Sequence, residues 1–146
     1  MAEAAAAGAR AVDDITVVLK RAEEAGADDV TSADGFIFAS PENLAAMSGM
    51  LKDFFDRTYY AALERLNGRP YLMMVCAGSD GHGAAQQIAR IATGWRLKAV
   101  AEPLIVCTHA TVTAQILSPK TLAIEDLRRC EELGLTLASG LALRVF

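Results

Sequence analysis

Short apolar runs alternate with longer amphipathic stretches along this chain. Four runs have the length and composition of strands, at residues 15–19, 35–39, 70–76 and 100–108. The third run, PYLMMVC, is apolar at almost every position, which is typical of a strand that is covered on both faces. The pattern therefore predicts strands that are separated by helices and by polar or glycine-rich connections.

The clearest amphipathic stretch covers residues 48–66. Lys52 with Asp56, and Asp53 with Arg57, have the i,i+4 spacing that supports a helix surface facing solvent. The apolar positions gather near the opposite face, as a helix packed on a core requires. We expect that buried face to consist of Leu51, Phe54, Phe55, Thr58, Ala62 and Leu66.

Three further helices are expected, at residues 2–12, 84–97 and 119–139. Strands that alternate with helices, each strand apolar throughout, predict an α/β fold with a parallel sheet and helices on both faces. A chain of 146 residues has the size of one domain, so residues 1–146 are predicted to form a single three-layer unit.

Charge and hydropathy exclude some classes of partner. The net charge is −4 and no cluster of lysine and arginine occurs, so we expect no nucleic-acid surface. No run of about 18 apolar residues is present, and we expect no membrane span. Residues 1–7 lack a basic stretch followed by a leucine-rich core, so a signal peptide is not expected and a cytoplasmic location is predicted.

The cysteines and large aromatic residues are read as structural. Cys76 and Cys107 each lie at the end of an apolar run, and we expect buried thiols there. Neither has a C-x-x-C partner or a histidine at metal-ligand spacing. Trp95 is expected to pack in the core or at an interface. Tyr59 and Tyr60 are adjacent, so only one of them can face the core.

Two polar connections follow strand-like runs, and both are candidate ligand loops. The first runs from Ser40 to Met47, and its Pro41 stiffens the turn. The second is Ala77-Gly78-Ser79-Asp80-Gly81-His82-Gly83, where glycines let backbone amides approach a ligand. In open α/β sheets, ligands bind outside the carboxyl ends of the strands, where both loops are predicted to lie.

The first loop and the helix after it carry a specific resemblance. The matching residues are Ser40, Pro41, Glu42, Met47, Ser48, Gly49, Leu51, Lys52, Phe54 and Asp56, followed in order by the glycine-rich loop. They resemble the flavodoxin-like family of FMN-dependent NAD(P)H and quinone reductases, which includes NADPH-dependent FMN reductases. The resemblance covers roughly residues 2–107 and implies a flavodoxin-like fold.

The resemblance also implies site residues and cofactors. FMN is the implied cofactor and NAD(P)H the implied electron donor. The residues implied to touch FMN are Ser40, Pro41, Glu42, Asn43, Leu44, Met47, Ala77, Gly78, Ser79, Asp80, Gly81 and Gly83. His82 is the candidate catalytic residue, since an imidazole can hydrogen-bond a flavin or a quinone oxygen near neutral pH. A plain strand-to-helix connection at 40–47 and a solvated His82 are the structural alternatives.

One expected part of the family pattern is missing from the sequence. The family's first strand and phosphate loop have no counterpart, because Met1, Ala2 and Glu3 already have a helical pattern. A shortened sequence and a rearranged sheet both remain open at this point. Without the phosphate's donors we expect weak FMN binding, and with an unpaired central strand edge we expect a homo-oligomer.

The predicted function is electron transfer from NAD(P)H through flavin to a quinone or a similar small acceptor. An electron-carrier or non-catalytic flavodoxin-like module, with weak or no FMN binding, is the first alternative. A small-molecule hydrolase is the second, and the lack of a nucleophile elbow or a catalytic-triad pattern disfavours it.

Overall fold

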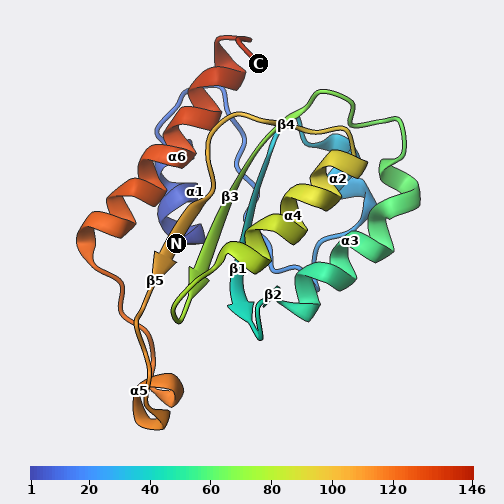
Figure 1. Ribbon diagram of the computed structural model, residues 1–146. Coiled ribbons are helices and arrows are strands. Elements are labelled where there is room, and N and C mark those ends of the chain that lie inside the picture. Colours follow the sequence, from blue (N-terminus) through green and yellow to red (C-terminus); the bar gives the residue numbers. More distant parts are fainter.

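A sheet lies between two layers of helices in the computed structural model, which describes residues 1–146 (Figure 1). The strands are β1 (Phe36–Asn43), β2 (Ala46–Met47), β3 (Pro70–Ala77), β4 (Lys98–Ala99) and β5 (Leu104–Cys107). The helices are α1 (Ala2–Arg10), α2 (Ala27–Ser32), α3 (Gly49–Ala62), α4 (His82–Gly94), α5 (Thr113–Leu117) and α6 (Ile124–Ala142). The predicted class, a mostly parallel sheet with helices on both faces, is confirmed.

β3 is the central strand of the sheet. β1 pairs with it in parallel, with Phe36 opposite Tyr71 at one end and Pro41 opposite Cys76 at the other. β4 and β5 pair in parallel with the other edge of β3, and the two-residue β2 folds back antiparallel on β1. The carboxyl ends of β1, β3 and β5 therefore lie at one edge of the sheet (Figure 1).

The larger core lies between the sheet and the layer of α3 and α4. All six residues predicted for the buried face of the 48–66 helix are buried. Phe55 packs edge-on against Phe38 of β1 and against Trp95, with ring centroids 5.1 Å apart in each pair. Trp95 is only 3% exposed, so the core-packing interpretation is correct. Aromatic pairs of this geometry add stabilisation beyond the area that they bury.

The smaller core joins α1 and α6 to the opposite face of the sheet. A side chain at Gly8 would place its Cβ 1.9 Å from the carbonyl oxygen of Glu131. At Gly134, the same atom would lie 1.8 Å from the carbonyl oxygen of Ala5. The two helices therefore touch through their backbones, which only glycine permits at these positions. None of the helices is long and apolar enough to span a membrane.

The predicted strand at residues 15–19 is wrong. The segment forms no strand, and residues 15–20 make no backbone–backbone hydrogen bond. Its composition suits a strand, but a strand also needs a neighbour to which its N–H and C=O groups can bond. Val18 and Leu19 are left 66% and 44% exposed. No strand precedes α1 in residues 1–146.

The boundaries of other predicted helices and strands also differ from those in the structure. Of the predicted strand 100–108 only β5 (Leu104–Cys107) forms, since Pro103 has no N–H to give to a ladder, and β4 lies before the predicted run. The predicted last helix begins later, at Ile124, because residues 108–123 form a projecting connection that contains α5. Tyr59 and Tyr60 are both exposed, so neither faces the core.

The prediction of buried thiols at Cys76 and Cys107 is wrong. Cys130 is buried, but Cys76 and Cys107 are half-buried at the ends of their strands. Burial raises the pKa of the thiols of Cys76 and Cys130 above the usual value, which keeps both protonated at neutral pH.

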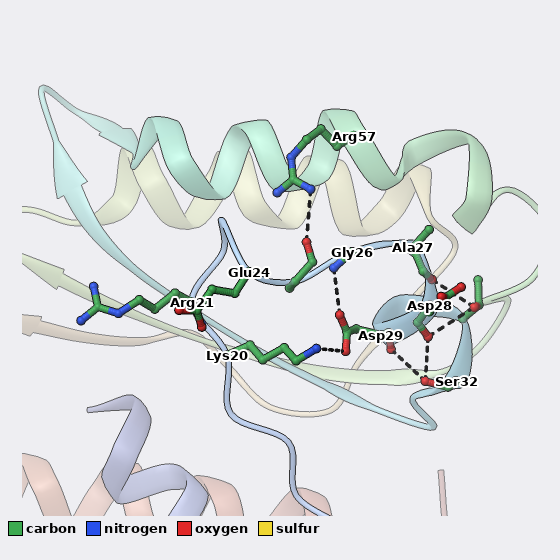
Figure 2. A network of polar contacts seen from close by, with 11 residues as sticks. Lys20, Arg21, Glu24, Gly26, Ala27, Asp28, Asp29, Ser32 and Arg57 are labelled. Atoms are coloured by element: carbon green, nitrogen blue, oxygen red, sulfur yellow. Dashed lines mark hydrogen bonds and ion pairs between the residues drawn. The ribbon is translucent and has the colours of Figure 1, made fainter.

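A polar network fastens the chain between α1 and β1 to α3 (Figure 2). Arg57 of α3 donates to the carbonyl oxygens of Ala22 and Ala25, at 2.9 and 3.2 Å. Asp29 accepts from the Lys20 ammonium at 2.6 Å and from the Gly26 N–H at 2.9 Å. These bonds hold the Asp29 carboxylate charged, and they lower its pKa below the ordinary value of 3.8, with the Lys20 bond as the main cause.

We expect Asp29→Asn to cost a small amount of stability at pH 7 and nothing in strong acid. A carboxyl whose pKa is lowered in the folded state stabilises that state above its unfolded pKa, and this contribution is lost as the pH falls through the folded pKa. Urea denaturation of both proteins at pH values from about 7 down to about 2 measures the difference. Asp28→Asn, one residue away and without a side-chain hydrogen bond, is the control; an equal effect of the two substitutions would contradict the assignment.

Candidate functional site

The carboxyl edge of the sheet brings the two predicted loops together. The first is the hairpin that joins β1 to β2, and the second is the connection from β3 to α4. The carboxylate of Glu42 links them, because its Oε1 accepts the N–H of Gly81 at 2.8 Å and its Oε2 accepts the N–H of Ala84 at 3.0 Å. A carboxylate at a helix N-terminus satisfies orphan N–H groups and favourably meets the helix dipole. Glu42 therefore caps α4 from a neighbouring strand.

The hairpin also packs closely against the first turn of α4. At Gly83, an added Cβ would lie 2.2 Å from the carbonyl oxygen of Ala45, so a larger residue would push the two loops apart. One turn further along α4, the Gln87 side chain accepts the N–H of Met47 at 3.1 Å. Glu42, Gly83 and Gln87 together hold the hairpin against this helix.

The tip of the hairpin has a strained backbone. Leu44 and Ala45 lie between the paired residues Asn43 and Ala46, and their φ values are +50° and +61°. A two-residue hairpin of type I′ requires positive φ at both central positions, which normally hold Asn-Gly or a similar pair. This conformation is sterically unfavourable for leucine and alanine. Strain of this kind is often found where a backbone is shaped for a ligand.

The hairpin divides the predicted contact residues into two groups. Leu44 is fully exposed, and Pro41 and Asn43 are also exposed. Ser40 and Met47 are buried, so neither offers its side chain to a ligand. The Ser40 hydroxyl accepts the Ser48 N–H at 3.0 Å and donates to the Pro41 carbonyl at 2.8 Å, which joins β1 to the start of α3.

The second loop presents backbone donors. The N–H groups of Gly78, Ser79 and Asp80 make no hydrogen bond within the protein, and all three residues are exposed. Successive N–H groups that point to solvent form a concave site for an electron-rich ligand atom. Gly81, at φ +88°, turns the chain into α4 and directs its own N–H to Glu42. Ala77 is buried and forms the base of the loop.

His82 lies at the first position of α4 and is exposed. Its Nδ1 is 2.6 Å from the Asp80 Oδ1, and both side chains are more than 60% exposed. The carboxylate can orient the imidazole and fix a proton on Nδ1, leaving Nε2 free for a ligand. Asp80 thus contacts His82, a pairing that the sequence did not predict.

A third segment at the same edge was missed from the sequence. The N–H groups of Thr108 and His109 donate to the carbonyl oxygens of Ala77 and Gly78, each at 2.8 Å. These two bonds fix the start of the second loop to the residues that follow β5. A cavity of about 340 Å³ opens beside them, between the end of β5 and the projecting α5 connection. Its lining includes Cys107, His109, Gln115, Lys120 and Asp126. The sequence did carry a signal, because the predicted strand-like run ends at Thr108 and His109 directly follows it.

Removal of the Glu42 charge should loosen the junction of the two loops. We expect Glu42→Gln to destabilise the protein by about 1–2 kcal/mol, because the amide replaces two charge-assisted bonds and places an NH₂ group opposite an N–H donor. The urea midpoint measures this loss. Glu102→Gln, at an exposed position without a side-chain hydrogen bond, is the matched control. A loss no greater than that of the control would refute the capping role.

Solved structures with the same arrangement include flavodoxins and flavodiiron proteins. A flavodoxin from the domain Archaea superposes with a TM-score of 0.74 at 16% identity, covering 96% of this chain and 87% of that one. The rubredoxin oxygen:oxidoreductase from Desulfovibrio gigas gives a TM-score of 0.77 at 15% identity, covering 99% of this chain and 33% of that one. At such identities the likeness establishes the fold, which is flavodoxin-like as the resemblance implied.

Curated relatives at higher identity have related descriptions. A protein described as flavodoxin from Aquifex aeolicus (strain VF5) is 35% identical over 61% of this chain and 47% of its own length. An NAD(P)H dehydrogenase (quinone) from Acidithiobacillus ferrooxidans (strain ATCC 53993 / BNL-5-31) is 36% identical over 40% of this chain and 39% of its own. The chain thus spans less than half the length of the curated relatives that it matches.

The sequence model of one family matches most of the chain. It covers residues 11–111, from the end of α1 to the residues just after β5, and so includes both loops at the carboxyl edge. This chain belongs to the NADPH-dependent FMN reductase family.

Proposed function

We propose that the carboxyl edge of the sheet binds the isoalloxazine ring of FMN, and that the protein moves electrons from NAD(P)H to a quinone or a similar small acceptor. The observation that carries the proposal is the row of free N–H groups at Gly78, Ser79 and Asp80, held by Glu42 against the hairpin. Bound flavin supplies the redox chemistry itself. The chain's part is to bind and orient the ring and to exclude water from it.

The exposed residues fit the two kinds of surface that a flavin ring presents. Its faces are flat and apolar, which suits the exposed side chains of Leu44 and Pro41. Its pyrimidine edge is rich in acceptors, which suits the backbone donors of the second loop. Ser40, Glu42, Met47, Ala77, Gly81 and Gly83 are then supporting residues that fix the two loops, and Asn43 is the polar side chain at the hairpin.

The chain offers fewer groups that could bind the phosphate of FMN. Residues 1–11 contain no serine, threonine or asparagine, and the first turn of α1 carries the acidic Glu3. We therefore expect binding through the ring to dominate and the affinity for FMN to be low.

An electron carrier without its own NAD(P)H activity is the second candidate function. It is favoured by the 35% identical relative described as flavodoxin, and by the flavodoxin structures that superpose on the fold. NAD(P)H oxidation by the FMN-loaded protein in the presence of a quinone separates the two functions. A protein that binds FMN but does not oxidise NAD(P)H would belong to the second class.

Self-association is part of the same proposal. β1 leaves one edge unpaired, and open strand edges recruit other chains. We expect oligomers at micromolar concentration by light scattering coupled to size exclusion. A single monomer peak over that concentration range would remove this element of the proposal without affecting the flavin site.

Leu44→Gly should raise stability and weaken flavin binding at the same time. Glycine accepts the positive φ, and we expect a gain of about 1 kcal/mol in the free energy of unfolding. Loss of the apolar contact should weaken FMN about tenfold, since burial of a leucine is worth about 1.5 kcal/mol or more. Urea denaturation and flavin fluorescence measure the two effects.

The matched control for this variant is Glu64→Gly. Glu64 also has a positive φ, +60°, but follows α3 and belongs to neither loop. It should gain stability and leave FMN binding unchanged. If Leu44→Gly also leaves FMN binding unchanged, the hairpin is only a strand-to-helix connection.

His82→Ala should lower kcat for quinone reduction more than it weakens FMN. A group that donates a proton or hydrogen bond to developing charge typically contributes about 10²-fold or more. Steady-state kinetics at saturating FMN and NAD(P)H give kcat, and fluorescence gives the FMN affinity. His109→Ala, the other histidine and also exposed at this edge, is the control. An unchanged kcat in His82→Ala would assign that residue to a solvated role.

A further inference from the structure

The cavity at the end of β5 lies outside the two loops of the candidate flavin site. Its volume is about 340 Å³, which is in the lower part of the range of about 300–1,000 Å³ found for small-molecule sites. Its lining comes from the end of β5, from the connection 108–123 that projects past the carboxyl edge, and from the start of α6 (Figure 1). The cavity has room for part of a dinucleotide but not for the whole of it.

The cavity borders the second loop of the candidate site. Cys107, which lines the cavity, donates through its thiol to the carbonyl oxygen of Asp80, with 3.6 Å between sulfur and oxygen. Thr108, also in the lining, is bonded to Ala77 at the base of that loop. A ligand that extends from the second loop into the cavity therefore stays on the carboxyl edge of the sheet.

Most polar groups in the outer wall of the cavity are already bonded to each other. The Lys120 ammonium donates to the carbonyl oxygens of Gln115, Ile116 and Ser118, at 2.7, 2.8 and 2.6 Å. An ammonium has three N–H donors, so these bonds leave none for a ligand. The side-chain oxygen of Gln115 accepts the N–H of Thr111 at 3.1 Å. The wall is thus held together by its own hydrogen bonds.

Asp126 offers the cavity an acceptor without a partner. Its side chain is only 26% exposed, and its Oδ1 accepts from the Arg129 guanidinium at 3.0 Å. Its Oδ2 makes no hydrogen bond within the protein. An ionised carboxylate is an acceptor only, so the group that suits this oxygen is a hydroxyl or an N–H of a ligand. The position of Asp126 in the first turn of α6 favours the negative charge.

We propose that this cavity binds the adenosine end of the pyridine nucleotide, with Asp126 Oδ2 accepting from the ribose hydroxyls, and that the protein therefore prefers NADH to NADPH. The assignment rests on the proposed function, in which the dinucleotide is the electron donor. A carboxylate that accepts from the 2′-hydroxyl is a general way to recognise the ribose of NAD. Pro119, Leu122 and Ala123 add apolar lining, which suits the flat base.

The 2′-phosphate of NADPH fits this cavity poorly. It occupies the position of the 2′-hydroxyl, so its negative charge would meet the Asp126 carboxylate in a partly buried site. Lys120 has no free N–H with which to bind it. Arg129 could attract a phosphate, but its charge is matched by the ion pair with Asp126. The family's description names NADPH, so a preference for NADH would set this chain apart.

Three mononucleotides test the cavity in the chain without FMN, by isothermal titration calorimetry. Adenosine 5′-phosphate should bind about tenfold more tightly than 2′-deoxyadenosine 5′-phosphate, which lacks a hydroxyl that bonds to a carboxylate. Adenosine 2′,5′-bisphosphate should bind more weakly than adenosine 5′-phosphate by about tenfold or more, because its 2′-phosphate meets Asp126.

One substitution and a matched control locate the effect. Asp126→Asn removes the charge and frees Arg129, so the bisphosphate should come within about threefold of adenosine 5′-phosphate or bind more tightly. Glu125→Gln removes the same net charge one residue earlier in the first turn of α6, at an exposed position outside the cavity lining. It should leave the order of the three affinities unchanged.

Two results of these titrations would overturn the proposal. One is equal binding of adenosine 5′-phosphate and the bisphosphate by the unsubstituted protein, or no binding of either below about 10 mM. The other is an affinity ratio that stays the same in Asp126→Asn, which would place the nucleotides elsewhere. Because FMN is absent from these measurements, a failure of the flavin site does not alter their meaning.

The FMN-loaded protein separates this proposal from the proposed function. kcat/KM should be about tenfold or more higher with NADH than with NADPH, and Asp126→Asn should abolish or reverse that ratio while Glu125→Gln keeps it. Oxidation of both nucleotides without preference would overturn the role of Asp126. If neither nucleotide is oxidised while the mononucleotides bind as expected, the proposed function fails and the adenosine site stands.

Discussion

Two backbone N–H groups, from Gly81 and Ala84, are bonded to the carboxylate of Glu42. This interaction joins the end of β1 to the start of α4, and the candidate site depends on it. Without an acceptor there, the first turn of α4 would leave buried donors unpaired, and the loop that precedes it would have no fixed position. The charge also meets the positive end of the helix dipole. One side chain thus determines where the free donors of Gly78, Ser79 and Asp80 lie relative to the hairpin.

The sequence predicted helices and strands well where hydrophobic periodicity alone determines which of the two forms. All six residues that the spacing placed on one face are buried, five of them in α3 and Leu66 after its end, and the run from Pro70 onward became the central strand. The strand prediction at residues 15–19 was wrong because composition shows only that these residues suit a strand. Whether they form a strand depends on a neighbour that is distant in sequence, and no neighbour pairs with them.

The candidate site was located correctly by topology but not in its details. Both loops lie at the carboxyl edge, as strand direction requires. The sequence could not separate the exposed Leu44 from the buried Met47, three residues away, because the two-residue hairpin that turns one outward has no Asn-Gly signal. Nor could it show that Glu42 bonds to a helix about forty residues later, since this depends on the register of β1 against β3.

The strain at the hairpin tip and the open edge of β1 are linked through the same strand. Of the seven non-glycine residues with positive φ, only Leu44 and Ala45 are apolar; the other five are polar or charged. The hairpin keeps this conformation because Glu42, Gly83 and Gln87 fasten it to α4. Glu42 is in turn carried by β1, whose residues 36–41 bond on one edge only. A strand held on one edge opens at a lower free-energy cost than one held on both. How firmly β1 is held therefore limits how firmly Glu42, and through it both loops of the candidate site, can be positioned.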